Sequence, residues 1–70
     1  MSRIVALGAP LELLSFALAG AELAEAATPD DVRAAWSSFD EQVGLVILTP
    51  DARRALPARL EGPLWAVLPE

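Results

Sequence analysis

The sequence predicts an α/β domain in which a parallel four-stranded sheet carries three helices on its two faces. Short apolar runs of the kind found in buried parallel strands alternate with segments of helical character along the chain. The tripeptide Thr-Pro-Asp occurs twice, and it places a capping hydroxyl, a proline and a carboxylate at the start of a helix. A length of 70 residues leaves room for a single domain, residues 1–70.

The first part of the chain predicts two strands with a helix between them. The apolar run 4–7 ends at Gly8 and suits a strand that is covered on both faces. The segment 10–19 begins with a proline, which the first turn of a helix accommodates, and Gly20 is a residue type that commonly ends helices. The segment 21–27 lies between this helix end and the next helix start. We therefore expect a short edge strand there, although its alanine and glutamate content favours helix.

A second helix and a central strand are predicted next. The helix begins at Thr28, and its apolar residues form one stripe in which Trp36 is expected to belong to the core. The stripe consists of Val32, Ala35, Trp36 and Phe39. The run 43–48 is the most strand-like of the chain, because it is apolar, contains several β-branched residues and is flanked by polar residues and a proline.

A third helix and a last strand complete the pattern. The helix begins at Thr49 and is expected to be kinked or divided at Pro57, because proline removes a helical hydrogen bond. Its inner stripe is predicted to be Ala52, Leu56 and Leu60. The run 64–68 is the last strand. With right-handed crossovers, this alternation predicts a flavodoxin-like sheet with the strand order 2-1-3-4.

The composition excludes several classes of function. Histidine, cysteine and lysine are absent, so the chain is expected to hold no disulfide, no metal site built from histidine or cysteine, and no catalytic nucleophile of the usual kinds. The net charge of −5 with five scattered arginines does not suit nucleic-acid binding. The four glycines are too far apart for a nucleotide-binding loop. We therefore expect no cofactor, no metal and no catalytic residue.

The apolar segments are too short for membrane insertion. The run after Arg3 is shorter than the core of a signal peptide, and the charge of Glu12 interrupts the apolar residues that follow. No stretch approaches the roughly 18 uncharged apolar residues that span a bilayer. The sequence predicts a soluble, cytoplasmic protein.

The carboxyl ends of the predicted strands are where an open parallel sheet binds ligands. A receiver domain that accepts a phosphoryl group needs an acidic cluster there to hold Mg²⁺, and the first strand instead ends in Leu7 and Gly8. Asp51 lies in the first turn of a helix, where its simplest role is to complement the helix dipole. Asp30 and Asp31 are adjacent on a helix and therefore diverge by about 100°.

Candidate interface residues lie on the first and third predicted helices and on the last strand. On a helical projection of 10–19, Phe16 falls on the polar side, away from an apolar side that includes Leu11 and Leu13. An exposed aromatic residue of this kind is common where proteins dock. The complete set of candidates is Phe16 with its neighbours Glu12, Ser15 and Ala19, the basic pair Arg53 and Arg54, and Trp65.

Five segments in this order resemble the F-subunit family of the prokaryotic V/A-type rotary ATPases. They are Arg3-Ile4-Val5-Ala6-Leu7-Gly8 as the first strand, Ser15-Phe16-Ala17-Leu18-Ala19-Gly20 for a family stretch GFRLAG, Ala27-Thr28-Pro29-Asp30-Asp31-Val32 as a helix start, Val43-Gly44-Leu45-Val46-Ile47-Leu48-Thr49 as the central strand, and Leu64-Trp65-Ala66-Val67-Leu68-Pro69 as the last. Two differences are visible. Family members commonly continue into a helical tail, and residue 17 is alanine where the family often has arginine.

This resemblance implies a non-catalytic component of the central stalk. A protein of this family docks on the coiled-coil rotor subunit (the D-subunit of these ATPases), outside the catalytic A/B ring, and helps to couple rotation of the ring to the stalk in ATP synthesis and ion or proton transport. It lies in the cytoplasm, peripheral to the membrane. On this hypothesis, Phe16→Ala weakens the complex with the rotor subunit and leaves the melting temperature nearly unchanged. The alternative is a pseudo-receiver or another small regulatory α/β module that binds a signalling partner or an anion.

Overall fold

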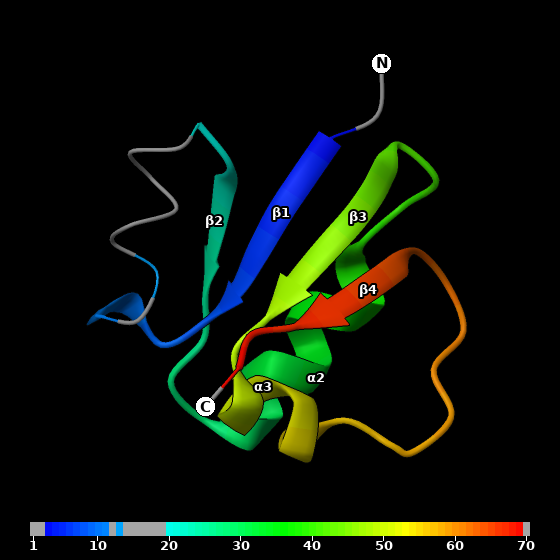
Figure 1. Cartoon of the computed structure of the whole chain (residues 1–70). Helices are drawn as coiled ribbons and strands as arrows, with labels where there is room; N and C mark the ends of the chain where they lie inside the picture. The colour runs from blue at the N-terminus through cyan, green and yellow to red at the C-terminus, as the bar shows by residue number, and fades with distance from the viewer. Residues whose placement is uncertain (1–2, 12, 14–19, 70) are drawn as a thin grey trace.

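The computed structural model describes residues 3–11, 13 and 20–69, and it confirms the predicted sheet (Figure 1). Its elements are β1 (Arg3–Gly8), β2 (Glu22–Glu25), α2 (Pro29–Ser38), β3 (Val43–Leu48), α3 (Pro50–Ala55) and β4 (Leu64–Val67). All strand pairs are parallel, and the order across the sheet is β2-β1-β3-β4. Within these residues no helix combines the length and the apolar character that a membrane span needs.

The predicted helix 10–19 falls mostly outside the described residues. Pro10, Leu11 and Leu13 are helical. Leu13 is fully buried, but Leu11 is 83% exposed, so the prediction that both share an apolar side is wrong. On a helix, the side chains of residues two positions apart point in directions that differ by about 200°, which is nearly opposite. The apolar side expected from the sequence was therefore too wide.

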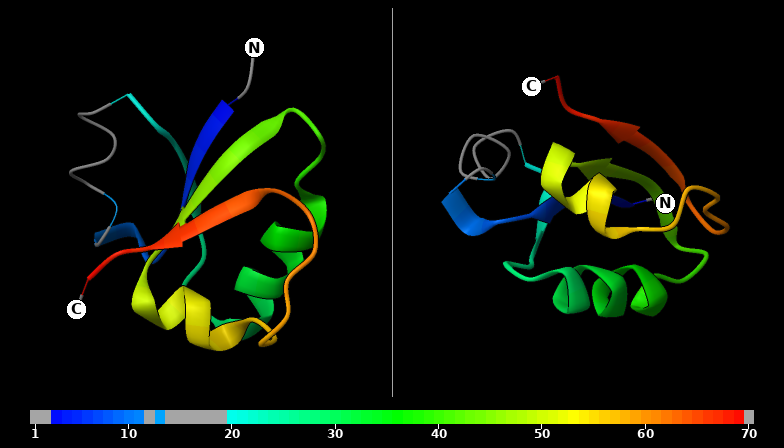
Figure 2. Two further views of the ribbon diagram at one scale, coloured as in Figure 1. Left: turned by 45° about the vertical axis from the view of Figure 1, so that its right-hand side comes forward. Right: turned by 90° about the horizontal axis from the view of Figure 1, so that it is seen from below.

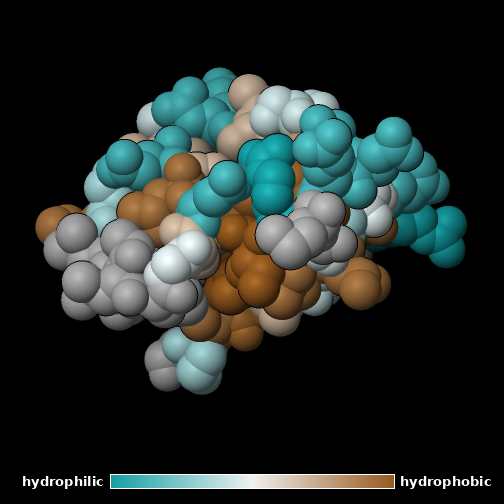
Figure 3. Space-filling model, turned by 90° about the horizontal axis from the view of Figure 1, so that it is seen from above, coloured by the Kyte–Doolittle hydropathy of each residue, from teal (hydrophilic) through white to brown (hydrophobic). Residues whose placement is uncertain are grey.

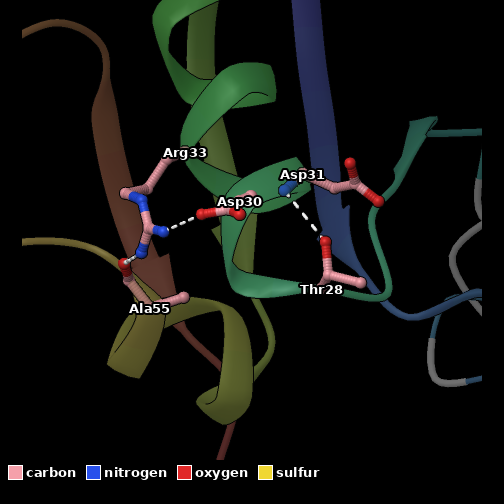
Figure 4. Close-up of polar contacts among 5 residues, drawn as sticks. All are labelled: Thr28, Asp30, Asp31, Arg33 and Ala55. Carbon is pink, nitrogen blue, oxygen red and sulfur yellow. Dashed lines mark hydrogen bonds and ion pairs between the residues drawn. The ribbon is translucent and has the colours of Figure 1, made fainter.

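Both described helices start as the sequence predicts. The Thr28 hydroxyl accepts a hydrogen bond from the Asp31 amide at 3.1 Å, and the Thr49 hydroxyl accepts one from the Ala52 amide at 3.2 Å. Proline follows each of these capping residues at the first helical position. Figure 4 shows the first cap, with the threonine hydroxyl directed at the amide of the first turn.

Helix α3 is shorter than predicted and ends before Pro57. The last helical residue is Ala55, and Leu56 has an extended backbone with φ −99° and ψ 155°. A residue that precedes proline avoids the helical region for steric reasons, so the helix is ended rather than kinked. Leu56 and Leu60 still pack inward, the first buried and the second half-buried, but from the connection that follows the helix.

One apolar core lies between the sheet and the two described helices. On the sheet side it contains Val5, Leu7, Val43, Val46 and Leu48, and on the helix side Val32, Ala52 and Leu56. Figure 2 shows α2 along one side of the strands. Trp36 was expected in the core and is half-buried at its margin, where its indole N–H donates to the Glu61 carbonyl at 3.2 Å.

The second face of the sheet is less completely covered than predicted. The alternation of side chains along a strand places Ile4 and Ala6 on the face opposite Val5 and Leu7. Ala6 is fully buried on this face, but Ile4 is 49% exposed. Ile4 pairs with Leu45 of β3, which in turn pairs with Leu64 of β4, and Leu64 is 75% exposed on the same face. Viewed from the end where the strands begin, hydrophobic side chains gather in the middle of the molecule with polar ones around them (Figure 3).

Candidate functional site

The structure brings together two of the predicted interface residues, Arg53 of α3 and Trp65 of β4. The guanidinium carbon of Arg53 lies 4.7 Å from the centroid of the Trp65 ring, which is a cation–π contact. Trp65 pairs with Val46 in the sheet, so it lies on the same face as the helices. Arg53 is half-buried, whereas Trp65 is 39% exposed.

The guanidinium of Arg53 is also held by the connection that follows α3. It donates hydrogen bonds to the carbonyls of Pro57 and Ala58, both at 2.9 Å. These bonds fix the side chain across the indole before any partner approaches. A partner that contacts the pair therefore loses little side-chain entropy on this side of the interface. Tryptophan and arginine are also the residue types most enriched among residues that dominate binding energy.

Arg54 belongs to a different part of the surface. It forms an ion pair with Asp51 one turn earlier on α3, and both side chains are well exposed. Its side chain lines a hollow at the carboxyl ends of the strands. Exposed pairs of this kind contribute little to stability. Phe16, Glu12, Ser15 and Ala19, the other predicted interface residues, lie outside the described residues.

The hollow at the carboxyl ends of the strands has a volume of about 390 Å³. The capping residues Thr28 and Thr49 line it together with Asp51 and Arg54. Both threonine hydroxyls already accept a hydrogen bond from a helix amide, and the aspartate and arginine pair with each other. Within the described residues, no group of three or more carboxylate, histidine or cysteine side chains is placed to hold a metal ion.

Gly8 is packed tightly against Thr49 beside this hollow. A Cβ atom built on Gly8 would lie 2.3 Å from the Thr49 methyl carbon and 2.6 Å from its hydroxyl oxygen. Thr49 is 1% exposed, and its amide donates to the Leu7 carbonyl at 3.2 Å. The absence of a side chain at Gly8 thus lets the end of β1 and the start of α3 approach each other.

Two further arginines connect elements at the surface, Arg3 through an ion pair and Arg33 through a hydrogen bond. Arg3 of β1 donates to Glu22 of β2 at 2.7 Å, and this hydrogen bond and the charge of Glu22 raise the pKa of Arg3. Arg33 of α2 pairs with Asp30 and donates to the Ala55 carbonyl of α3 at 3.3 Å, as Figure 4 shows.

Sequence reasoning missed the exposure of the apolar residues on β4. Continuous apolar runs predict strands buried on both faces, but all four residues Leu64–Val67 are exposed. The contact of Arg53 with Trp65 was missed as well, because nothing local in the sequence relates residues that are paired only by the fold. The available signal was that the arginine and the tryptophan belong to consecutive elements, since β4 is the next element after α3.

Comparisons with known proteins give no relative. No protein-family model, no curated protein and no solved structure matches the chain.

Proposed function

We propose that this chain is a non-catalytic binding module that docks on the coiled-coil rotor subunit of a prokaryotic V/A-type ATPase. In this role it would help to couple rotation of the A/B ring to the central stalk, peripheral to the membrane and without contact to nucleic acid. The proposal combines the resemblance of five sequence segments to the F-subunit family with the parallel β2-β1-β3-β4 sheet.

The observation that carries the proposal is the Arg53–Trp65 pair. It presents a partly exposed indole with a guanidinium held above it. The outer positions of coiled coils are rich in long side chains with carboxylate ends. The indole offers apolar area to the stems of such side chains, and the guanidinium offers hydrogen-bond donors to their carboxylates. The surface thus fits a helical, acidic partner.

The proposal is tested by co-elution of the chain with the coiled-coil rotor subunit of its own organism. We expect a complex at concentrations of about 10 μM. Trp65→Ala is expected to weaken it about fivefold or more, because loss of a central aromatic residue commonly costs over 1 kcal/mol of binding. Leu23→Ala on the opposite edge strand is the matched control, since Leu23 is 37% and Trp65 39% exposed. A complex that is absent, or that both variants weaken equally, contradicts the proposal.

A second candidate is the regulatory or pseudo-receiver module. The hollow between Thr28 and Thr49 favours it, because this hollow lies where open parallel sheets bind ligands. Titration with phosphate analogues and Mg²⁺, followed by NMR, separates the two candidates. Shifts confined to Gly8, Thr28 and Thr49 support the second candidate. Unchanged spectra, together with a complex with the rotor subunit, support the first.

A further inference from the structure

Strand β4 differs from the other edge strand in that none of its own residues is charged, although the Arg53 guanidinium of α3 lies over the Trp65 ring on the face of the helices. Strand β2 carries Glu22 and Glu25, and charged side chains of this kind protect edge strands from pairing with other chains. Strand β4 contains only apolar residues, and all four are exposed. In the described part of the chain, β4 is last in the strand order and pairs with β3 alone.

The hydrogen bonds of β4 show which backbone groups point outward. The Leu68 amide donates to the Leu48 carbonyl of β3 at 2.9 Å. Backbone groups alternate along a strand, so Ala66 and Leu64 also turn toward β3. The amides and carbonyls of Trp65 and Val67 therefore face away from the sheet, at the edge that no described residue covers.

We infer that two copies of this chain pair through β4 as antiparallel strands related by a two-fold axis perpendicular to the sheet. Such an axis keeps each side chain on its own face of the sheet, and side chains alternate between the two faces along a strand. Residues that lie opposite each other are therefore both even-numbered or both odd-numbered. When Ala66 lies opposite the second copy's Ala66, Trp65 lies opposite the second copy's Val67. This register joins all the outward groups of both strands in four backbone hydrogen bonds.

The side chains suit this register on both faces of the sheet. On the face of the helices, Trp65 lies beside the second copy's Val67, and aromatic residues paired with β-branched ones stabilise antiparallel strands. On the other face, Ala66 meets its own copy at the close, non-hydrogen-bonded position, where its small side chain fits. Leu64, 75% exposed in the single chain, lies opposite the second copy's Leu68.

The charges on the strands' own residues favour β4 over β2 as the pairing edge. Each chain has a net charge of −5, so any self-association brings together molecules that repel each other. Pairing through β2 would also place the carboxylate of Glu25, and that of Glu22 with its partner Arg3, close to the carboxylates of the second copy. Pairing through β4 keeps these groups at the far edges of the joined sheet, about 14 Å beyond each β4 at the usual strand spacing.

The expected dimer is weak and depends on concentration. One short strand from each copy buries less than the roughly 1,200 Å² of a standard stable interface. We expect a dissociation constant of about 100 μM. The inference concerns the isolated chain and does not rest on the proposed function, so failure of either leaves the other standing.

Sedimentation equilibrium of the full chain from about 10 μM to 1 mM tests the inference. The apparent mass should rise from 7.4 kDa toward twice that value. Val67→Pro removes an outward amide without touching the bonds to β3, so we expect this variant to stay monomeric. Leu23→Pro is the matched control. The Ala26 amide donates to the Gly8 carbonyl of β1, so the Leu23 amide also points outward, at the other edge, and this variant should dimerise like the parent.

Hydrogen exchange of the unsubstituted chain gives a second readout that needs no variant to fold. The Trp65 and Val67 amides should exchange several-fold more slowly at 1 mM than at 10 μM, in proportion to the fraction of chain that is still monomeric, whereas the Leu23 amide should not change. A mass that stays at 7.4 kDa up to 1 mM overturns the inference. So does a dimer that Val67→Pro leaves intact or that Leu23→Pro disrupts equally, and so does exchange at Trp65 and Val67 that is independent of concentration.

Discussion

Replacement of Gly8 by alanine is expected to be among the most destabilising small changes in this chain. The new Cβ would lie 2.3 Å from the Thr49 methyl carbon, a separation that forces one of the two elements to move. Thr49 is 1% exposed and cannot turn aside without releasing the Ala52 amide that it caps. The backbone angle at Gly8 is ordinary, so the cost comes from space alone.

The magnitude follows from two effects. Overpacking in a closely packed site costs about 1–3 kcal/mol, and loss of a helix cap costs about 1 kcal/mol. We therefore expect Gly8→Ala to lower the free energy of unfolding by about 2–4 kcal/mol. A chain of this length has a total of roughly 4–10 kcal/mol, so the variant should be visibly less stable, with a melting temperature lower by about 10 °C or more.

Urea unfolding followed by circular dichroism measures this change, and Thr49→Ser provides the control. Serine keeps the capping hydroxyl and removes the methyl group that the new Cβ would meet. The double variant should therefore be more stable than the sum of the two single changes predicts, by about 1 kcal/mol. A Gly8→Ala chain within about 0.5 kcal/mol of the parent, or effects that are simply additive, would refute the close packing of Gly8 on Thr49.

Three further predictions concern the helices and the sheet edge. Thr28→Ala should lower the free energy of unfolding by about 1 kcal/mol, as measured by urea unfolding, because the Asp31 amide loses its partner; an unchanged midpoint would contradict the cap. Leu56→Ala should cost about 2–4 kcal/mol in the same assay, since this side chain is 8% exposed in the core; a cost below 1 kcal/mol would mean that the connection after α3 does not pack there. Glu22→Gln should destabilise slightly and by the same amount at pH 7 and pH 9. Because the pKa of Arg3 is raised in the folded chain, its contribution to the free energy of unfolding is fully present below the ordinary pKa of arginine and is lost only as the pH rises through the raised value. An effect of Glu22→Gln that disappears between pH 7 and pH 9 would therefore contradict the Arg3–Glu22 pair.

The strands and both described helix starts could be predicted because their causes are local. The repeated threonine and proline residues specify helix starts, and the apolar runs between them specify strands. The strand order is not local, and its prediction came from the flavodoxin-like arrangement that this alternation of strands and helices favours. Even the segment 21–27, whose composition favours helix, is an edge strand at Glu22–Glu25. For this segment, the position between two helices decides the secondary structure against its intrinsic helix propensity.

The surface could be predicted only in part, because exposure depends on what the fold places opposite each residue. An apolar run shows that a strand forms, but not whether another strand pairs with it on each side. Among the described residues, β4 pairs with a strand on one side alone. From the sequence, Arg53, Arg54 and Trp65 could be predicted as candidate interface residues, but not which of them contact each other. The fold joins Arg53 to Trp65 and turns Arg54 toward Asp51 instead.

Docking on the coiled-coil rotor subunit is best tested by an NMR titration of the labelled chain with that subunit. We predict that the largest shifts fall on Arg53, Trp65 and the residues next to them, and that Trp65→Ala reduces the affinity while the spectrum stays that of a folded chain. Spectra that do not change at partner concentrations of about 100 μM would contradict it, and so would shifts that gather at Gly8, Thr28 and Thr49.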